Sequence, residues 1–209
     1  VEVRSSNPNG DPDLESDPRT LEADGRGVIS PVSFKRKLRD LVSEKAGPVW
    51  RQWAAEVDWE VEDPSWRDSG GFRYEILETR GRNRDEIAKM SADAFGAQFW
   101  DARVFGNTFL ESLKAGKDKR DVSHFISTGA GQVGVGLSVS PVEIDRWTQT
   151  NKAGVQEGKD RGMAPLGFRV VRHAVYGIPV FVNPSVARKT GMTVRDLSLL
   201  RVLLPYAYS

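Results

Sequence analysis

The strongest constraint on this chain is a polar loop, rich in turn residues, that leads directly into a short basic helix. Residues 5–27 contain two Asn, three Pro and three Gly, a composition that leaves little room for regular structure. Ser30 then stands where a helix N-cap is expected, with Pro31 at the first helical position. The residues that recur at i, i+4, i+7 and i+8, as on the apolar side of a helix, are Phe34, Leu38, Leu41 and Val42.

The other side of this predicted helix is basic. Four of five consecutive positions carry positive charge, at Lys35, Arg36, Lys37 and Arg39. Lys35 and Arg39 are one turn apart and therefore share a face. This face predicts a contact with a polyanion, and a solvated basic surface is the alternative interpretation.

The loop before the helix can present polar groups to the same ligand. Pro8 and Pro12 restrict its backbone, and Gly10 can adopt a positive φ. Asn7, Asn9 and backbone N–H groups can then face a phosphate or a ribose while the helix supplies the charge.

Charge is unevenly distributed along the chain. The 209 residues are enough for one large domain or for a core with insertions, and the net charge is only +1. However, residues 1–24 hold seven acids and two bases, and residues 25–45 hold six bases and two acids. Residues 169–209 hold six bases and one acid. Such segregation permits a basic face on a nearly neutral protein.

Several classes of protein are disfavoured by composition. The chain has no cysteine, which removes disulfides, thiol catalysis and zinc–thiolate sites and suits a reducing, cytoplasmic location. No apolar run approaches the roughly 18 residues that a membrane span needs, so we expect no membrane contact. The chain begins at Val1 in a strand-like VEVR and stops at YAYS without a cap, so we expect both ends to be trimmed.

Strand and helix signals interleave along the chain, which predicts the α+β class. We expect strands at 72–79, 101–105, 133–139, 169–176 and 178–182. We expect helices at 83–99, after an N-cap at Asn183 or Ser185, and after an N-cap at Thr193. Residues 46–69 differ, because they contain six acids, two bases and four of the six Trp residues. They indicate an inserted subdomain or a protein contact surface. The four are Trp50, Trp53, Trp59 and Trp66.

A glycine pattern after this region does not predict a dinucleotide site. Gly129, Gly131 and Gly134 match G-x-G-x-x-G, which in such sites opens a helix on the pyrophosphate. Here the following residues alternate as a strand and include Gly136. The glycines instead indicate a close backbone approach to a ligand or to another strand.

Catalytic and metal-binding patterns are incomplete. A calcium loop centred on Gly10 would use Asn7, Asn9, Asp11 and Asp13, but Ser5 and Ser16 occupy its first and twelfth positions. The only histidines, His124 and His173, are far apart, and no G-x-S-x-G nucleophile motif is present. We therefore expect no enzyme activity, no metal and no cofactor.

Four segments, taken in order, resemble the Cas seven family. The first joins SNPNGDPD to GRGVISPVSFKRKLRD, and the others are FWDARVFG (99–106), TGAGQVGVGLSVSPV (128–142) and YGIPVFVNPSVARKTGMTVRDLSLL (176–200). The resemblance runs from residue 5 to about residue 204 and is looser over 46–96 and 145–168. GAGQ replaces the family's commoner G-P-V-Q at residues 129–132.

This family contains the backbone subunits of type I CRISPR effector complexes (Cascade), and the chain is most similar to the branch of subtypes C and B. The resemblance implies one RRM-like (ferredoxin-like) domain over 1–209, an inserted subdomain at 46–96 and a thumb-like insertion at 145–168. It also implies a non-catalytic role in prokaryotic antiviral defence. Copies would form a helical filament along CRISPR RNA with other Cascade subunits, and the guide would pair with target DNA.

The resemblance also assigns site residues. Those implied to bind RNA are Asn7, Asn9, Asp11, Arg26, Lys35, Arg36, Arg39, Arg103 and Gln132. Met163 and Leu166 are the candidates for an apolar thumb tip that kinks the RNA. Two alternatives stay open. One is an RNA-cleaving subunit of a type III-like complex with Asp11 or Asp13 as the active acid, and the other is a protein-interaction module built on the Trp-rich segment.

Overall fold

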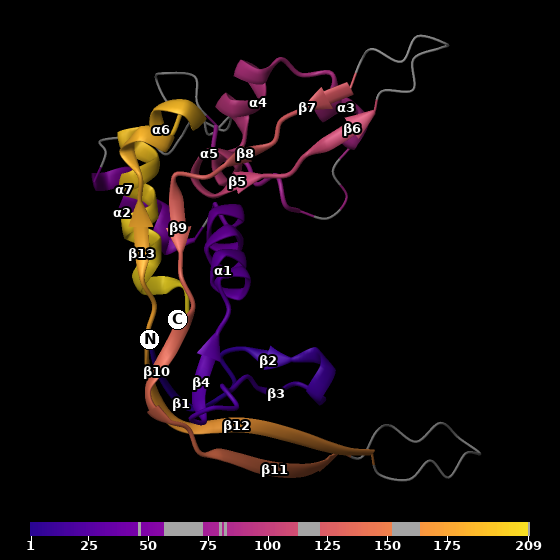
Figure 1. The fold of residues 1–209 in the computed structure, drawn as a ribbon, viewed down its shortest axis with the longest axis vertical. Coiled ribbons are helices and arrows are strands. Elements are labelled where there is room, and N and C mark those ends of the chain that lie inside the picture. The colour runs from indigo at the N-terminus through magenta and orange to yellow at the C-terminus, as the bar shows by residue number, and fades with distance from the viewer. Residues whose placement is uncertain are drawn as a thin grey trace, which may run out of the picture. The chain divides into compact units, whose positions relative to one another are not determined.

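The structure is a computed structural model that describes residues 1–45, 47–56, 73–79, 81, 83–112, 122–151 and 164–208. It contains helices and antiparallel sheets, which confirms the predicted α+β class. The chain forms two compact units (Figure 1). Unit 1 comprises Val1–Ser33 and Gly134–Pro179, and unit 2 comprises Phe34–Val133 and Val180–Ser209. The predicted boundaries at 46–96 and 145–168 stay predictions.

Unit 1 is built on a five-stranded antiparallel sheet. Its strands are β1 (Glu2–Ser6), β4 (Arg26–Ile29), β10 (Gly136–Pro141), β11 (Ile144–Asn151) and β12 (Ala164–Gly177). The order is β1-β12-β10-β4, and β11 pairs with the first half of β12 from Ile144↔Val171 to Asn151↔Ala164. β11 and β12 therefore form a long hairpin that begins at the sheet (Figure 1).

The polar loop of unit 1 is more regular than its composition predicts. β2 (Gly10–Asp11) pairs with β3 (Asp17–Pro18), and the short 3-10 helix η1 (Pro12–Leu14) lies between them. The expectation of an irregular loop over 5–27 is therefore wrong. Side-chain hydrogen bonds supply the order, because the Asp11 carboxylate accepts from the Asp13 N–H at 3.1 Å and caps η1.

Unit 2 holds most of the helices. They are α1 (Pro31–Ser43), α2 (Pro48–Glu56), α3 (Arg84–Ala88), α4 (Ala92–Gln98), α5 (Trp100–Phe105), α6 (Pro184–Thr190), α7 (Val194–Leu203) and the 3-10 turn η2 (Leu204–Tyr206). The predicted caps are confirmed. Ser33 N–H donates to Ser30 Oγ at 3.2 Å, the Asn183 side chain accepts from the first turn of α6, and Thr193 forms a capping box with Asp196.

Short strand pairs complete unit 2. β5 (Gly106–Asn107) pairs with β8 (Ser127–Thr128), β6 (Leu110–Ser112) pairs with β7 (Val122–His124), and β9 (Gly131–Val133) pairs with β13 (Val180–Val182). The glycine-rich segment thus forms strands at Gly131–Val133 and Gly136–Pro141, and no helix begins there. A Cβ on Gly129 would overlap the backbone of Phe105 and Gly106, so the glycines serve close strand approach.

Three sequence predictions in unit 2 are wrong. Residues 73–79 form no strand and contribute isolated bridges, among them Glu75↔Phe99. The helix expected at 83–99 is split into α3 and α4, because Ser91 caps a new helix by accepting from Ala94 N–H. DARVF forms the helix α5 rather than a strand, and all six residues of α5 are buried.

Aromatic residues make up much of the interior of unit 2. Trp50, Trp53 and Tyr74 are fully buried and meet edge to face, with ring centroids 5.0–5.9 Å apart. The expectation of a Trp-rich contact surface is therefore wrong for Trp50 and Trp53, which bury their rings in the core. Trp59 and Trp66 lie outside the described residues.

A search of the helices in the described ranges finds none with the length and apolar character needed to cross a bilayer.

Candidate nucleic-acid interface

The two asparagines of the unit 1 loop hold its shape. Asn7 Nδ2 donates to Ser16 O at 2.7 Å, and Asn7 Oδ1 accepts from Asn9 N at 3.2 Å. Asn9 Oδ1 accepts from Ser30 N at 2.7 Å and so ties the loop to the residue that caps α1. Each amide therefore has partners within the protein and fixes the backbone of the loop.

The charged residues of this loop are paired as well. Arg19 lies 3.3 Å from Asp11, and the Arg26 Nε lies 2.6 Å from Asp24. Hydrogen bonds from the Arg26 backbone and side chain lower the pKa of Asp24. Arg26 remains half-exposed, so its positive charge can still act on a ligand while Asp24 offsets part of it.

Arg39 does not belong to an exposed basic face. Its side chain is 6% exposed, and its guanidinium contacts Asp101 at 3.0 Å and Glu78 at 3.1 Å. Asp101 is itself buried and accepts from Leu77 N–H at 2.7 Å and Glu78 N–H at 3.1 Å. The expectation that Lys35 and Arg39 form a shared RNA-contacting pair is wrong, because Arg39 is neutralised in the interior.

Three other basic residues of α1 remain at the surface of unit 2. Arg36 is exposed and forms an ion pair with Asp40 at 2.7 Å, and its Nη1 donates to Glu78 O at 2.9 Å. Lys35 Nζ lies 5.3 Å from the Phe105 ring centroid, and Lys37 Nζ lies 4.6 Å from that of Tyr208. In the described ranges, no carboxylate forms an ion pair with Lys35 or Lys37. Lys35 and Lys37 therefore keep their full charge, while Asp40 offsets part of the charge of the exposed Arg36.

The environment of Lys35 affects its charge. Burial lowers the pKa of Lys35, the neighbouring Arg39 lowers it further, and Glu78 acts in the opposite direction. A bound phosphate would favour the charged ammonium.

Arg103 is a structural residue. Its guanidinium is fully buried and forms a two-pronged contact with Asp196, at 2.7 Å through Nη2 and 3.1 Å through Nε. It also donates to the carbonyl oxygens of Gly96, Ala97 and Arg73 at 2.8–3.0 Å. The expected RNA contact of Arg103 is therefore wrong, because five acceptors within the protein surround the guanidinium.

Gln132 lies at the surface of unit 2. In β9 its neighbours Gly131 and Val133 are buried while Gln132 is exposed. The strand register places Gln132 directly opposite Phe181 of β13. Phe181 is 64% exposed and was missed as a candidate. The alternation in IPVFV could have identified it, because the residue between two inward-facing valines faces outward.

The predicted thumb coincides with the β11–β12 hairpin. Met163 lies outside the described residues, and Leu166 lies in β12 opposite Gln149. Nearer the sheet, Trp147 and Phe168 are cross-strand partners, and each is 46% exposed. The roles of Met163 and Leu166 in RNA kinking stay predictions.

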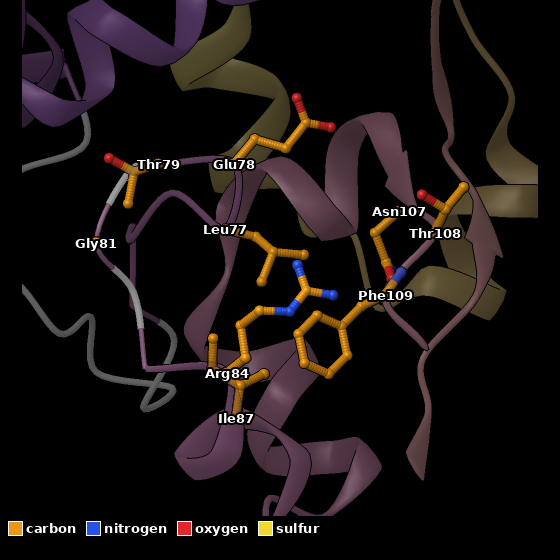
Figure 2. Close-up of a pocket in the computed structure, with 9 residues that line it drawn as sticks. All are labelled: Leu77, Glu78, Thr79, Gly81, Arg84, Ile87, Asn107, Thr108 and Phe109. Carbon is orange, nitrogen blue, oxygen red and sulfur yellow. The ribbon is translucent and has the colours of Figure 1, made fainter. Parts of the chain in front are cut away.

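A pocket of about 360 Å³ lies elsewhere in unit 2 (Figure 2). Its lining combines apolar and polar side chains, among them Leu77, Arg84, Asn107 and Phe109. The Arg84 guanidinium lies over the Phe109 ring at 5.2 Å, and Asn107 Oδ1 accepts from Phe109 N–H at 2.9 Å. None of the predicted RNA-binding residues lines this pocket. Among the residues that the structure describes, no group of three His, Cys, Asp or Glu side chains is placed to hold a metal ion.

Comparison with known proteins identifies the family. The family described as CRISPR-associated protein Cas7 matches residues 1–209. The chain belongs to the Cas7 family. A search of curated proteins finds no match.

Solved structures support the same fold. A chain of a CRISPR RNA-guided surveillance complex matches 99% of this chain with 16% identity and a TM-score of 0.50. A chain of a pre-nicking CRISPR RNA-guided surveillance complex matches all of it with 17% identity and a TM-score of 0.51. The present chain spans 56% of the length of the first structure and 70% of the second. At this identity the similarity establishes the fold.

Proposed function

We propose that this chain is a non-catalytic CRISPR RNA-binding backbone subunit of a type I CRISPR effector complex. The observation that carries the proposal is the match of the Cas7 family over residues 1–209. Copies of the chain assemble side by side along one CRISPR RNA together with other Cascade subunits, and the guide bases pair with target DNA. The protein acts in the cytoplasm of a prokaryote in antiviral defence, and its core is RRM-like.

The contacts in this proposal are with the RNA backbone. Lys35, Arg36 and Arg26 supply positive charge, and Gln132 supplies an amide. The loop held by Asn7, Asn9 and Asp11 presents backbone to the RNA. Contacts of this kind carry no base information, which suits a subunit that must accept any guide sequence.

The type III-like alternative requires a free carboxylate near the RNA. The Asp11 carboxylate instead caps η1 and lies 3.3 Å from Arg19, which favours a structural role. Incubation of the assembled complex with guide-complementary RNA and Mg²⁺ or Mn²⁺ should leave the RNA intact. Regularly spaced cuts that disappear in Asp11→Ala or Asp13→Ala would establish the alternative.

The salt dependence of RNA binding tests the proposed interface. We expect the wild-type chain to bind unstructured single-stranded RNA in fluorescence anisotropy titrations over a range of salt concentrations. Removing one phosphate-binding charge should reduce the log–log slope by about 0.7, so Lys35→Gln combined with Arg36→Gln should reduce it by about 1.4. Lys89→Gln, which removes an exposed charge next to α3, is the matched control. An unchanged slope in the double variant would remove α1 from the interface.

A further inference from the structure

Gln132 and Phe181 form an exposed polar–aromatic pair on the β9–β13 sheet. Figure 1 shows the two strands side by side, and the register pairs these residues directly. Directly opposed residues of antiparallel strands project from the same face, with Cβ atoms about 4.5–5.5 Å apart. Gly131 and Val133 alternate with Gln132 and are buried, so the pair occupies the outward face.

The ring of Phe181 is exposed and available. Its residue exposure is 64%, and within the described ranges it neither stacks on another aromatic ring nor carries a cation over its face. Its backbone is fixed by pairing with β9. A ligand that covers the ring therefore costs little conformational entropy.

The chemistry of the pair fits a nucleobase better than a protein side chain. Protein anchors occupy pockets with other apolar groups around them, whereas Phe181 has an exposed amide beside it and only half-buried valines along its strand. A base is flat and similar in size to the ring, and its polar edge or the ribose 2′-OH can bond to the Gln132 amide, which both donates and accepts.

We propose that Phe181 stacks on a base of the bound RNA and that Gln132 hydrogen-bonds to the same nucleotide. This inference rests on the proposed function and adds a stacking residue to contacts made by charged side chains, by the Gln132 amide and by backbone. Stacking is tolerant of sequence because every base has a π face, so the contact is compatible with any guide.

Substitution of Phe181 tests the inference in the 209-residue chain. Phe181→Leu should weaken binding of unstructured single-stranded RNA about 5- to 100-fold, whereas Phe181→Trp should bind as tightly as wild type. The salt slope of Phe181→Leu should equal that of wild type, because no charge is removed. Val194→Ala, which trims an 84% exposed apolar side chain of the same unit, should leave affinity unchanged.

A fluorescent base separates stacking from other contacts. In RNA with 2-aminopurine at successive positions, wild-type protein should quench the probe at one or more positions, and Phe181→Leu should abolish that quenching. Wild-type-like affinity and quenching in Phe181→Leu would overturn the inference while leaving the proposed function intact. Light scattering without RNA gives a further test, since loss of self-association in Phe181→Leu would assign the ring to a protein interface and overturn base stacking. Failure of the wild-type chain to bind RNA would instead refute the proposed function itself.

Discussion

At the scale of single residues, the D-x-R sequence of α5 acts as a buried connector within unit 2. Asp101 accepts from Arg39 of α1 and from two backbone N–H groups, and Arg103 joins Asp196 of α7 to three backbone carbonyls. Buried charges are tolerated only when such partners replace water. The α1 and α7 partners lie 62 and 93 positions away in sequence. Local charge patterns could therefore not show that Arg39 and Arg103 are interior residues.

Removal of one side of a buried ion pair should destabilise the fold strongly. Arg103→Ala removes the cation beside the buried Asp196 carboxylate and one donor from each of three carbonyl groups, and we expect it to lower the free energy of unfolding by about 3–5 kcal/mol. Urea titration followed by tryptophan fluorescence measures this destabilisation, since Trp50, Trp53 and Trp100 are fully buried.

An exposed pair supplies the control for this experiment. Arg4 lies 2.7 Å from Glu2, but its side chain is 77% exposed. Arg4→Ala should leave the urea midpoint almost unchanged, because water solvates the remaining carboxylate. Equal effects of the Arg4 and Arg103 substitutions would contradict the structural role of Arg103.

At the scale of elements, the sequence predicts well where helices begin. It predicts poorly whether a short buried segment forms a helix or a strand. Ser30, Asn183 and Thr193 all cap helices as expected, because capping is a local interaction over three or four residues. DARVF forms a helix despite its β-branched and aromatic content, because both of its charged side chains are fixed by tertiary contacts. The candidate site shows the same difference between local and tertiary interactions. The sequence could predict that Arg36 and Gln132 are exposed, but not that tertiary contacts bury Arg39.

The glycine-rich segment provides a test at this scale. Gly129→Ala would place a Cβ against the backbone of Phe105 and Gly106, where β8 meets β5, and backbone cannot rotate away. We expect the free energy of unfolding to fall by about 3 kcal/mol. Gly96→Ala is the matched control, because its Cβ would meet no atom within 4 Å and it lies inside α4. That substitution should stabilise the protein by about 0.5–1 kcal/mol, so urea midpoints that shift in the same direction would refute the close-approach assignment.

At the scale of the whole molecule, the proposed function requires that a single copy, which offers few contacts, bind a long guide. Useful affinity for such an RNA requires many copies side by side, each holding a few nucleotides. A head-to-tail contact that does not close produces a helical filament. The β11–β12 hairpin is the candidate element for joining neighbouring copies and the RNA, because its strands continue beyond the part of β12 that pairs with β1 and β10.

Deletion of the outer hairpin should separate folding from assembly. Replacing residues 148–164 with a short Gly-Ser bridge retains the pairs from Ile144↔Val171 to Trp147↔Phe168, and the second half of β12 remains between β1 and β10. We therefore expect a folded monomer with near-wild-type far-UV circular dichroism. RNA-dependent oligomers should become shorter or disappear in size-exclusion chromatography with light scattering on a long guide RNA.

A second variant, in which residues 152–163 are replaced by Gly and Ser at equal length, keeps the β11–β12 pairing and removes Met163. If the deletion impairs assembly and the Gly-Ser replacement does not, the strands themselves make the contact. If both variants impair assembly, the side chains of residues 152–163 are required. Full-length RNA-bound assemblies formed by the deletion variant would show that the hairpin is not the thumb, and the proposed kinking of RNA by this element would be excluded with it.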